Sequence, residues 1–90
     1  MQKILVVEDD FDIQELLQNF LQEAGYNVIV ANDGVEALSI YASDQIDLIL
    51  LDVMLPKIDG FSVCELIRKQ SQIPIIIVNV ISKRACNFNQ

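Results

Sequence analysis

Three carboxylates directly follow two apolar segments, at positions where they could act together on a cation. Glu8 and Asp9 follow residues 4–7, and Asp52 follows residues 48–51. Short runs rich in β-branched residues are typical of strands that are buried on both faces of a parallel sheet. If these two strands are neighbours, their carboxyl ends share one edge of the sheet, and we expect the three carboxylates to converge there. Converging carboxylates either take up protons or bind a hard cation, and Mg2+ suits one or two carboxylates completed by water and phosphate.

A helical pattern follows the first of these strands. Asp12 and Glu15 have the spacing of a capping box at its start, and Gly25 fits the position just after its end. We interpret Asp10 and Asp12 as loop residues or helix caps rather than as ligands. The apolar residues recur with helical spacing, which predicts one apolar face made of Ile13, Leu16, Leu17, Phe20, Leu21 and Ala24.

The remaining segments continue an alternation of strands and helices. Residues 28–31 and 75–78 are two further apolar runs that predict strands, and Asp33 and Glu36 again have capping-box spacing, which predicts a second helix. The positions that mark a third helix are Phe61, Cys64 and Ile67. The order is therefore βαβαβαβ. With right-handed crossovers it predicts an α/β fold, an open parallel sheet with helices on its faces.

Length, composition and charge limit the class of protein. The 90 residues predict one small domain, and 52% apolar residues exclude a disordered chain. Acids outnumber bases 13 to 6, which gives a net charge of −7, so we expect no direct binding to nucleic acid. The absence of histidine excludes the usual Cys/His zinc site. The apolar stretch near the N-terminus is too short for a secretory core, and no apolar run approaches the length of a membrane span, so we expect a cytoplasmic protein without membrane contact.

The surroundings of the carboxylates argue against several classes of enzyme. No glycine-rich loop follows residues 4–7, which disfavours dinucleotide-binding and P-loop proteins, and no Gly-x-Ser-x-Gly segment is present. Asp52 lacks the second acid two residues later that aspartate-nucleophile phosphatases use. A phosphohydrolase that turns over an external substrate therefore ranks last among the functions considered.

Two longer motifs carry a resemblance to a known family. Residues 4–10 read Ile-Leu-Val-Val-Glu-Asp-Asp, and residues 50–61 read Leu-Leu-Asp-Val-Met-Leu-Pro-Lys-Ile-Asp-Gly-Phe. An acid pair, an aspartate after a later strand and a following Pro-x-x-Asp-Gly resemble the receiver domain of bacterial two-component response regulators. The resemblance covers roughly residues 3–78 and implies a flavodoxin-like sheet with strand order 2-1-3-4.

The resemblance implies a role for each acid of the motif. Asp52 would be the phosphoacceptor, forming an acyl phosphate with a phosphoryl group from a histidine kinase or a phosphotransfer protein. Asp9, Asp52 and the backbone carbonyl of Met54 would hold Mg2+, and Glu8 would act through water. The metal would neutralise charge on the phosphoryl group while the protein positions it. The chain would not be an enzyme, beyond catalysing its own phosphorylation.

The sequence departs from the family pattern near its C-terminal end. Asn79, followed by Val80, stands where the family has Thr or Ser followed by Ala, and its amide can still donate a hydrogen bond to a phosphoryl oxygen. The family's fourth helix, its fifth strand with a lysine, and its fifth helix have no counterpart before Gln90. We therefore expect residues 1–81 to be a truncated receiver domain and residues 82–90 to be a tail outside the family.

Two functions remain open on the sequence alone. The first is a magnesium-dependent signalling switch that is phosphorylated on Asp52. The second is a truncated or degenerate receiver that acts only as an interaction module or is a non-functional remnant, because the Thr/Ser and Lys positions have changed. Phosphorylation by a small donor separates the two. Residues 73–81 also form a nearly continuous apolar strand, whose unpaired edge predicts a homodimer through the fourth strand.

Overall fold

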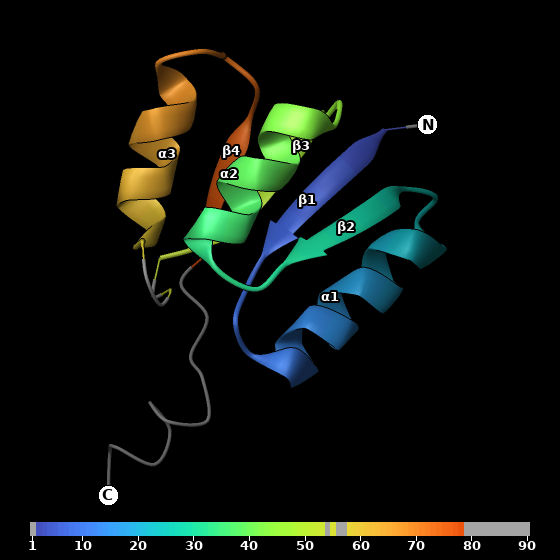
Figure 1. The fold of residues 1–90 in the computed structure, drawn as a ribbon. Coiled ribbons are helices and arrows are strands. Elements are labelled where there is room, and N and C mark those ends of the chain that lie inside the picture. Colours follow the sequence, from blue (N-terminus) through green and yellow to red (C-terminus); the bar gives the residue numbers. More distant parts are fainter. Residues whose placement is uncertain (1, 54, 56–57, 79–90) are drawn as a thin grey trace, which may run out of the picture.

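The computed structural model describes residues 2–53, 55 and 58–78, and in these residues four parallel strands alternate with three helices (Figure 1). The strands are β1 (Lys3–Val7), β2 (Asn27–Ala31), β3 (Leu48–Asp52) and β4 (Ile75–Val78). The helices are α1 (Phe11–Glu23), α2 (Gly34–Ser43) and α3 (Gly60–Arg68). The sheet has the order β2-β1-β3-β4, so the predicted parallel α/β fold with order 2-1-3-4 is confirmed.

Several sequence predictions fall on residues that the structure does not describe. Met54 and Asn79 lie outside the described residues, and so do the predicted domain end at residue 81 and the predicted tail at residues 82–90. These assignments stay predictions.

The register of the sheet brings the ends of its strands level. Val7, the last residue of β1, pairs with Ala31 of β2 and with Leu51 of β3, and Asp52 pairs with Val78 at the end of β4. The chain order reverses at β1, because β2 lies on one side of it and β3 on the other. The residues that follow β1 and those that end β3 therefore meet at the switch point of the sheet, where α/β proteins place their sites.

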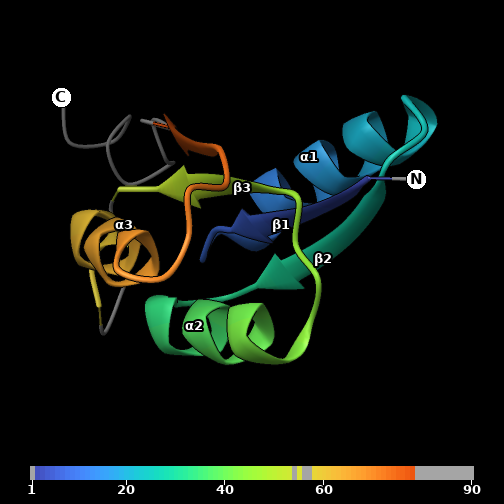
Figure 2. The same cartoon turned by 90° about the horizontal axis from the view of Figure 1, so that it is seen from above.

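The helices cover the two faces of the sheet unequally (Figure 2). Helix α1 lies on one face, packed on β1 and β2, and α2 and α3 lie on the other. Along β1, Ile4 and Val6 are buried and alternate with the two β1 residues of the main core. This strand is thus buried on both faces, as its β-branched run predicts. The main core consists of Leu5, Val7, Ala31, Ala37, Ile46, Ile49, Leu51, Val63 and Ile67.

The start of α1 differs from the sequence prediction. The capping residue is Asp10, whose side chain accepts a hydrogen bond from the backbone N–H of Ile13 at 3.1 Å, and the helix begins at Phe11. The predicted capping box of Asp12 and Glu15 is wrong by two residues, because the short connection from β1 lets the helix begin earlier. The prediction that Gly25 follows the helix end is confirmed, since its φ of +100° is the left-handed conformation that glycine adopts readily.

The apolar patterns of α1 and α3 predict the helices correctly but do not predict which side chains are buried. Leu16 and Phe20 are exposed by 67% and 70%, one helical turn apart on α1. In α3, Phe61 is exposed by 63%, whereas Val63 and Ile67 are fully buried. Because α1 packs on the β1–β2 half of the sheet, the described residues leave the stripe of Leu16 and Phe20 uncovered.

The first residues of α3 lie against the end of β3. Asp59 caps the helix by accepting from the backbone N–H of Ser62 at 2.9 Å, and the backbone N–H of Gly60 donates to the carbonyl of Val53 at 3.2 Å. A Cβ atom on Gly60 would collide with the backbone of Asp52 and Val53. Glycine at this position therefore allows the start of α3 to pack directly against the residue that ends β3.

None of the helices in the part of the chain that the structure describes has the length and apolarity needed to cross a membrane.

Replacing Gly60 by alanine should destabilise the fold. The added Cβ forces the backbone of β3 or α3 to shift, and we expect Gly60→Ala to lower the free energy of unfolding in urea by roughly 1–3 kcal/mol. Gly25→Ala is the comparison, because no atom lies within 4 Å of a Cβ there and its cost comes from the positive φ alone, without a steric collision. Equal unfolding free energies for Gly60→Ala and the unmodified chain would show that the contact is not tight.

Candidate functional site

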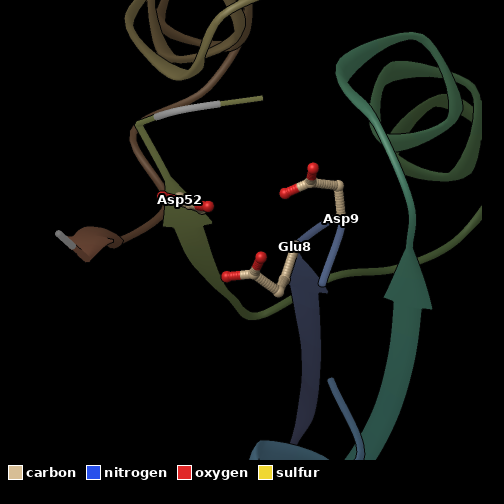
Figure 3. A group of neighbouring side chains, drawn as sticks. All are labelled: Glu8, Asp9 and Asp52. Atoms are coloured by element: carbon tan, nitrogen blue, oxygen red, sulfur yellow. The ribbon is translucent and has the colours of Figure 1, made fainter. Parts of the chain in front are cut away.

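The three predicted carboxylates meet at one edge of the sheet. Glu8 and Asp9 follow β1, and Asp52 is the last residue of β3 (Figure 3). One oxygen from each carboxylate lies within 4.8 Å of the other two. The side chains of Glu8 and Asp9 point toward Asp52 across the gap between the two strand ends (Figure 3). The structure therefore confirms that the three acids converge. Their roles as metal ligands and as phosphoacceptor stay predictions.

Two of these acids are buried, which is unusual for charged side chains. Glu8 is 3% exposed and Asp52 is 6% exposed, whereas Asp9 is half-buried. Their burial follows from the sheet register, because the backbone N–H of Glu8 continues the β1–β2 ladder by donating to the carbonyl of Ala31 at 3.1 Å. A carboxylate taken out of water at such a place loses hydration free energy unless protons, hydrogen-bond donors or a cation compensate.

Glu8 shows the electrostatic cost of this arrangement. Its pKa is raised from 4.5 to about 7, chiefly by burial and in smaller part by the negative charge of Asp52, against the lowering effect of the Asp10 backbone N–H. That N–H donates to Oε2 at 2.9 Å. The other oxygen, Oε1, is buried without a hydrogen-bond partner among the described residues. An acceptor in this situation has the chemistry of a group that binds water or a cation.

The donor set of the cluster suits a hard divalent cation. Three carboxylates supply only oxygen ligands, and Glu8 keeps one buried oxygen that no described residue satisfies. Mg2+ prefers such ligands and keeps several waters, so it can bind at a site with few protein oxygens. The residues present thus fit a magnesium site. Asp10 takes no part in the cluster, since its side chain caps α1.

Comparisons with known proteins define the family of this chain. The family model of the response regulator receiver domain matches residues 4–86. The chain therefore belongs to the receiver domains of two-component response regulators.

A curated relative shows the same family in a longer protein. The chain is 46% identical over 81 residues to the probable transcriptional regulator ycf27 of Porphyridium aerugineum, and the match covers 90% of this chain and 34% of the relative. The chain thus spans about a third of the length of this relative.

Two solved structures share both the fold and the sequence pattern. Response regulator protein TrrA of Thermotoga maritima, in complex with Mg2+-BeF, superposes with a TM-score of 0.83 at 40% identity, covering 93% of this chain and 73% of TrrA. TrrA in complex with the histidine kinase ThkA gives a TM-score of 0.85 at 42% identity, covering 91% of this chain and 72% of that TrrA chain.

Sequence reasoning missed one residue beside this cluster. Gln14 is a polar side chain in α1 that is only 7% exposed, and its amide donates to the backbone carbonyl of Glu8. A signal was present in the sequence, because Gln14 lies three residues before Leu17 and seven before Leu21, on the stripe that packs on the sheet. A polar residue on that stripe needs a buried partner.

The raised pKa of Glu8 should make the metal-free protein less stable as pH rises from about 4.5 to about 7. In this window the unfolded chain has released the proton of Glu8 while the folded chain still holds it, so raising pH favours unfolding. Below the window Glu8 is protonated in both states, and above it ionised in both, so this contribution stops changing.

The variant Glu8→Gln should remove this part of the pH dependence, because its amide does not titrate. Urea unfolding with a chelator between about pH 5 and about pH 8 measures it. Glu15→Gln, an exposed carboxylate of α1, serves as the control and should keep the slope of the unmodified chain. If Glu8→Gln and the unmodified chain lose stability equally with pH, the raised pKa belongs to another group.

Proposed function

We propose that this chain is a signalling switch in which Asp52 accepts a phosphoryl group from a histidine kinase or a phosphotransfer protein, with Mg2+ bound at the acid cluster. The observation that carries this proposal is the position of Asp52, buried at the end of β3 with carboxylate oxygens of Glu8 and Asp9 within 4.8 Å. TrrA, to which the chain is similar, has been solved with Mg2+-BeF and with a histidine kinase, which supports both parts of the proposal.

The proposed reaction is an in-line transfer between a histidine nitrogen and a carboxylate oxygen. An oxygen of Asp52 bonds to phosphorus, the bond from phosphorus to the histidine ring nitrogen breaks, and that nitrogen keeps the electron pair. Bound Mg2+ supplies the positive charge that an incoming phosphoryl group needs beside three carboxylates. Because the strand end is fixed, the attacking oxygen is already oriented before reaction, and little orientational entropy remains to be lost in the transition state.

Each remaining residue of the predicted site has a place in this proposal. Asp9 and Asp52 contribute carboxylate oxygens to the metal, and Glu8 acts through a water held by Oε1, the oxygen that no described residue satisfies. The backbone carbonyl of Met54 completes the protein ligands, and the amide of Asn79 donates to a phosphoryl oxygen. The chain thus catalyses at most its own phosphorylation and turns over no external substrate. We further propose that it acts in the cytoplasm and, with a net charge of −7, does not bind nucleic acid directly.

Phosphorylation by a small donor tests the proposal. With acetyl phosphate or phosphoramidate and Mg2+, the intact mass should increase by one phosphoryl group, and a chelator should prevent the gain. Asp52→Asn should show no gain. Asp9→Asn should slow the gain about tenfold or more, because it removes a ligand of the cation whose positive charge stabilises the transition state.

Asp12→Asn provides the matched control, because it makes the same change in charge in the first turn of α1, outside the cluster. It should react like the unmodified chain. A chain that gains no phosphoryl group, although folded and supplied with Mg2+, would instead support the alternative of a receiver that acts only as an interaction module or is a non-functional remnant.

The edge of the sheet also supports a proposal about partners, namely that two copies of the chain associate through β4. Ile76 and Ile77, neighbours on this strand, are exposed by 50% and 40%, and β4 pairs with β3 on one side. In the described ranges no strand pairs with its other side. An apolar edge of this kind is a template for pairing with another chain.

Light scattering should then show a mass that rises from monomer to dimer with concentration. Ile76→Lys should abolish the rise, because it places a charge on the pairing strand. Leu16→Lys, the same type of change at a more exposed site on α1, should leave it intact. A monomer at every concentration would contradict the dimer and leave the proposal for Asp52 untouched.

A further inference from the structure

Gln14 links the acid cluster to a distant part of the fold through its side-chain amide. The residue is on α1, is 7% exposed, and is one of the buried polar side chains of the described structure. Its Nε2 donates to the backbone carbonyl of Glu8 and also to Oδ1 of Asn32, at 2.6 Å, just after β2. The two N–H groups of this amide thus donate to different elements, one to the backbone at the acid cluster and one to the residue that follows β2.

The hydrogen-bond chain continues from Asn32 into the first turn of α2. The side-chain Nδ2 of Asn32 donates to Oε1 of Glu36 at 3.0 Å, and its backbone N–H donates to the same oxygen at 2.7 Å. Glu36 is held in turn to the start of α2, because its backbone N–H donates to the capping side chain of Asp33 at 2.8 Å. The contacts therefore run without a break from the peptide after β1 to the start of α2.

The acceptors at the two ends of this series of hydrogen bonds determine the direction of every bond in it. The carbonyl of Glu8 can only accept, so Gln14 must turn its NH2 group toward it. The oxygens of Glu36 accept in the same way, so Asn32 must turn its NH2 group toward them and its oxygen toward Gln14. A side chain without donors at position 14 would remove both the bond to Glu8 and the bond to Asn32, and would so interrupt the series of hydrogen bonds.

The carbonyl that Gln14 holds belongs to the peptide unit that joins Glu8 to Asp9. The orientation of this peptide decides how both carboxylates are directed at the cation, and the backbone N–H of Asp10, one residue on, donates to Glu8 Oε2 at 2.9 Å. If either acid changes its coordination, we therefore expect the carbonyl oxygen that accepts from Gln14 to move.

We infer that Gln14 is a positioning residue that orients the Glu8–Asp9 peptide for the cation and transmits metal occupancy of the acid cluster to the start of α2. This inference rests on the proposed function, since it needs Mg2+ to bind at Glu8, Asp9 and Asp52. Outer hydrogen-bond partners of metal ligands typically change affinity about 10- to 100-fold when removed. A side chain that only filled space in α1 would have neither effect.

The test is a magnesium titration of the full chain followed by backbone amide shifts in NMR spectra. In the unmodified chain we expect shifts at the cluster (Glu8, Asp9 and Asp52) and at the start of α2 (Asn32 and Glu36). Gln14→Met keeps the length of the side chain without its donors. It should weaken Mg2+ binding about tenfold and remove the response of Asn32 and Glu36 at saturation, while the cluster still responds.

Gln18→Met is the matched control, because it makes the same change one turn later on α1, and it should behave like the unmodified chain. Asn32→Ala, at an exposed site, is a second variant in case Gln14→Met does not fold. It keeps the bond from Gln14 to Glu8, so it should retain most of the affinity and lose the response at Glu36.

The outcomes separate this inference from the proposed function. If Mg2+ leaves the amides of Glu8, Asp9 and Asp52 unshifted in the unmodified chain, the magnesium site itself is wrong. If those amides shift, but Gln14→Met, or Asn32→Ala in its place, keeps the full response of Glu36, the inference about Gln14 is overturned and the proposed function stands.

Discussion

The acid cluster depends on one constraint, the register that brings the carboxyl ends of β1 and β3 level at the same edge of the sheet. Val7 pairs with Leu51, so the next residues along each strand, Glu8 and Asp52, must lie side by side. The apolar strands that set this register gain free energy from burial, which outweighs the repulsion between the acids that follow them. A shift of one residue would exchange the two faces of β1, so that Leu5 and Val7 would leave the main core for the opposite face.

The same register places the buried carboxyl group of Glu8 beside another carboxylate, an arrangement that is unfavourable unless a proton or a cation offsets the charge. The raised pKa of Glu8 and the lack of a partner for its Oε1 among the described residues have one cause, the burial of a carboxylate beside another. A ligand that binds only the folded state adds to its stability in proportion to the logarithm of its concentration above Kd. A cation bound at this edge would therefore make the stability of the fold depend on the concentration of the metal, which agrees with the switch proposed above.

The sequence predicted the parts of the fold that depend on local pattern and missed those that depend on packing. Strand ends and helix existence follow from runs and periodicity, so Glu8, Asp9 and Asp52 could be brought together before the fold was known. Capping-box spacing alone could not choose between Asp10 and Asp12, because the length of the connection from β1 decides the first helical turn. Likewise, periodicity marked Leu16 as apolar, but only the position of α1 over β1 and β2 shows that it stays exposed.

The arrangement also ties the starts of three helices to the edge that carries the acid cluster. Each helix begins at the carboxyl edge of the sheet, and each is capped there by an aspartate, at Asp10, Asp33 and Asp59. Helix α1 joins the cluster through the Asp10 backbone N–H on Glu8, and α3 through the close approach of Gly60 to the backbone of Asp52. Helix α2 is tied to the same edge through its first turn. If Asp52 is phosphorylated as proposed above, the helices expected to respond are those whose first turns are already bound to this edge.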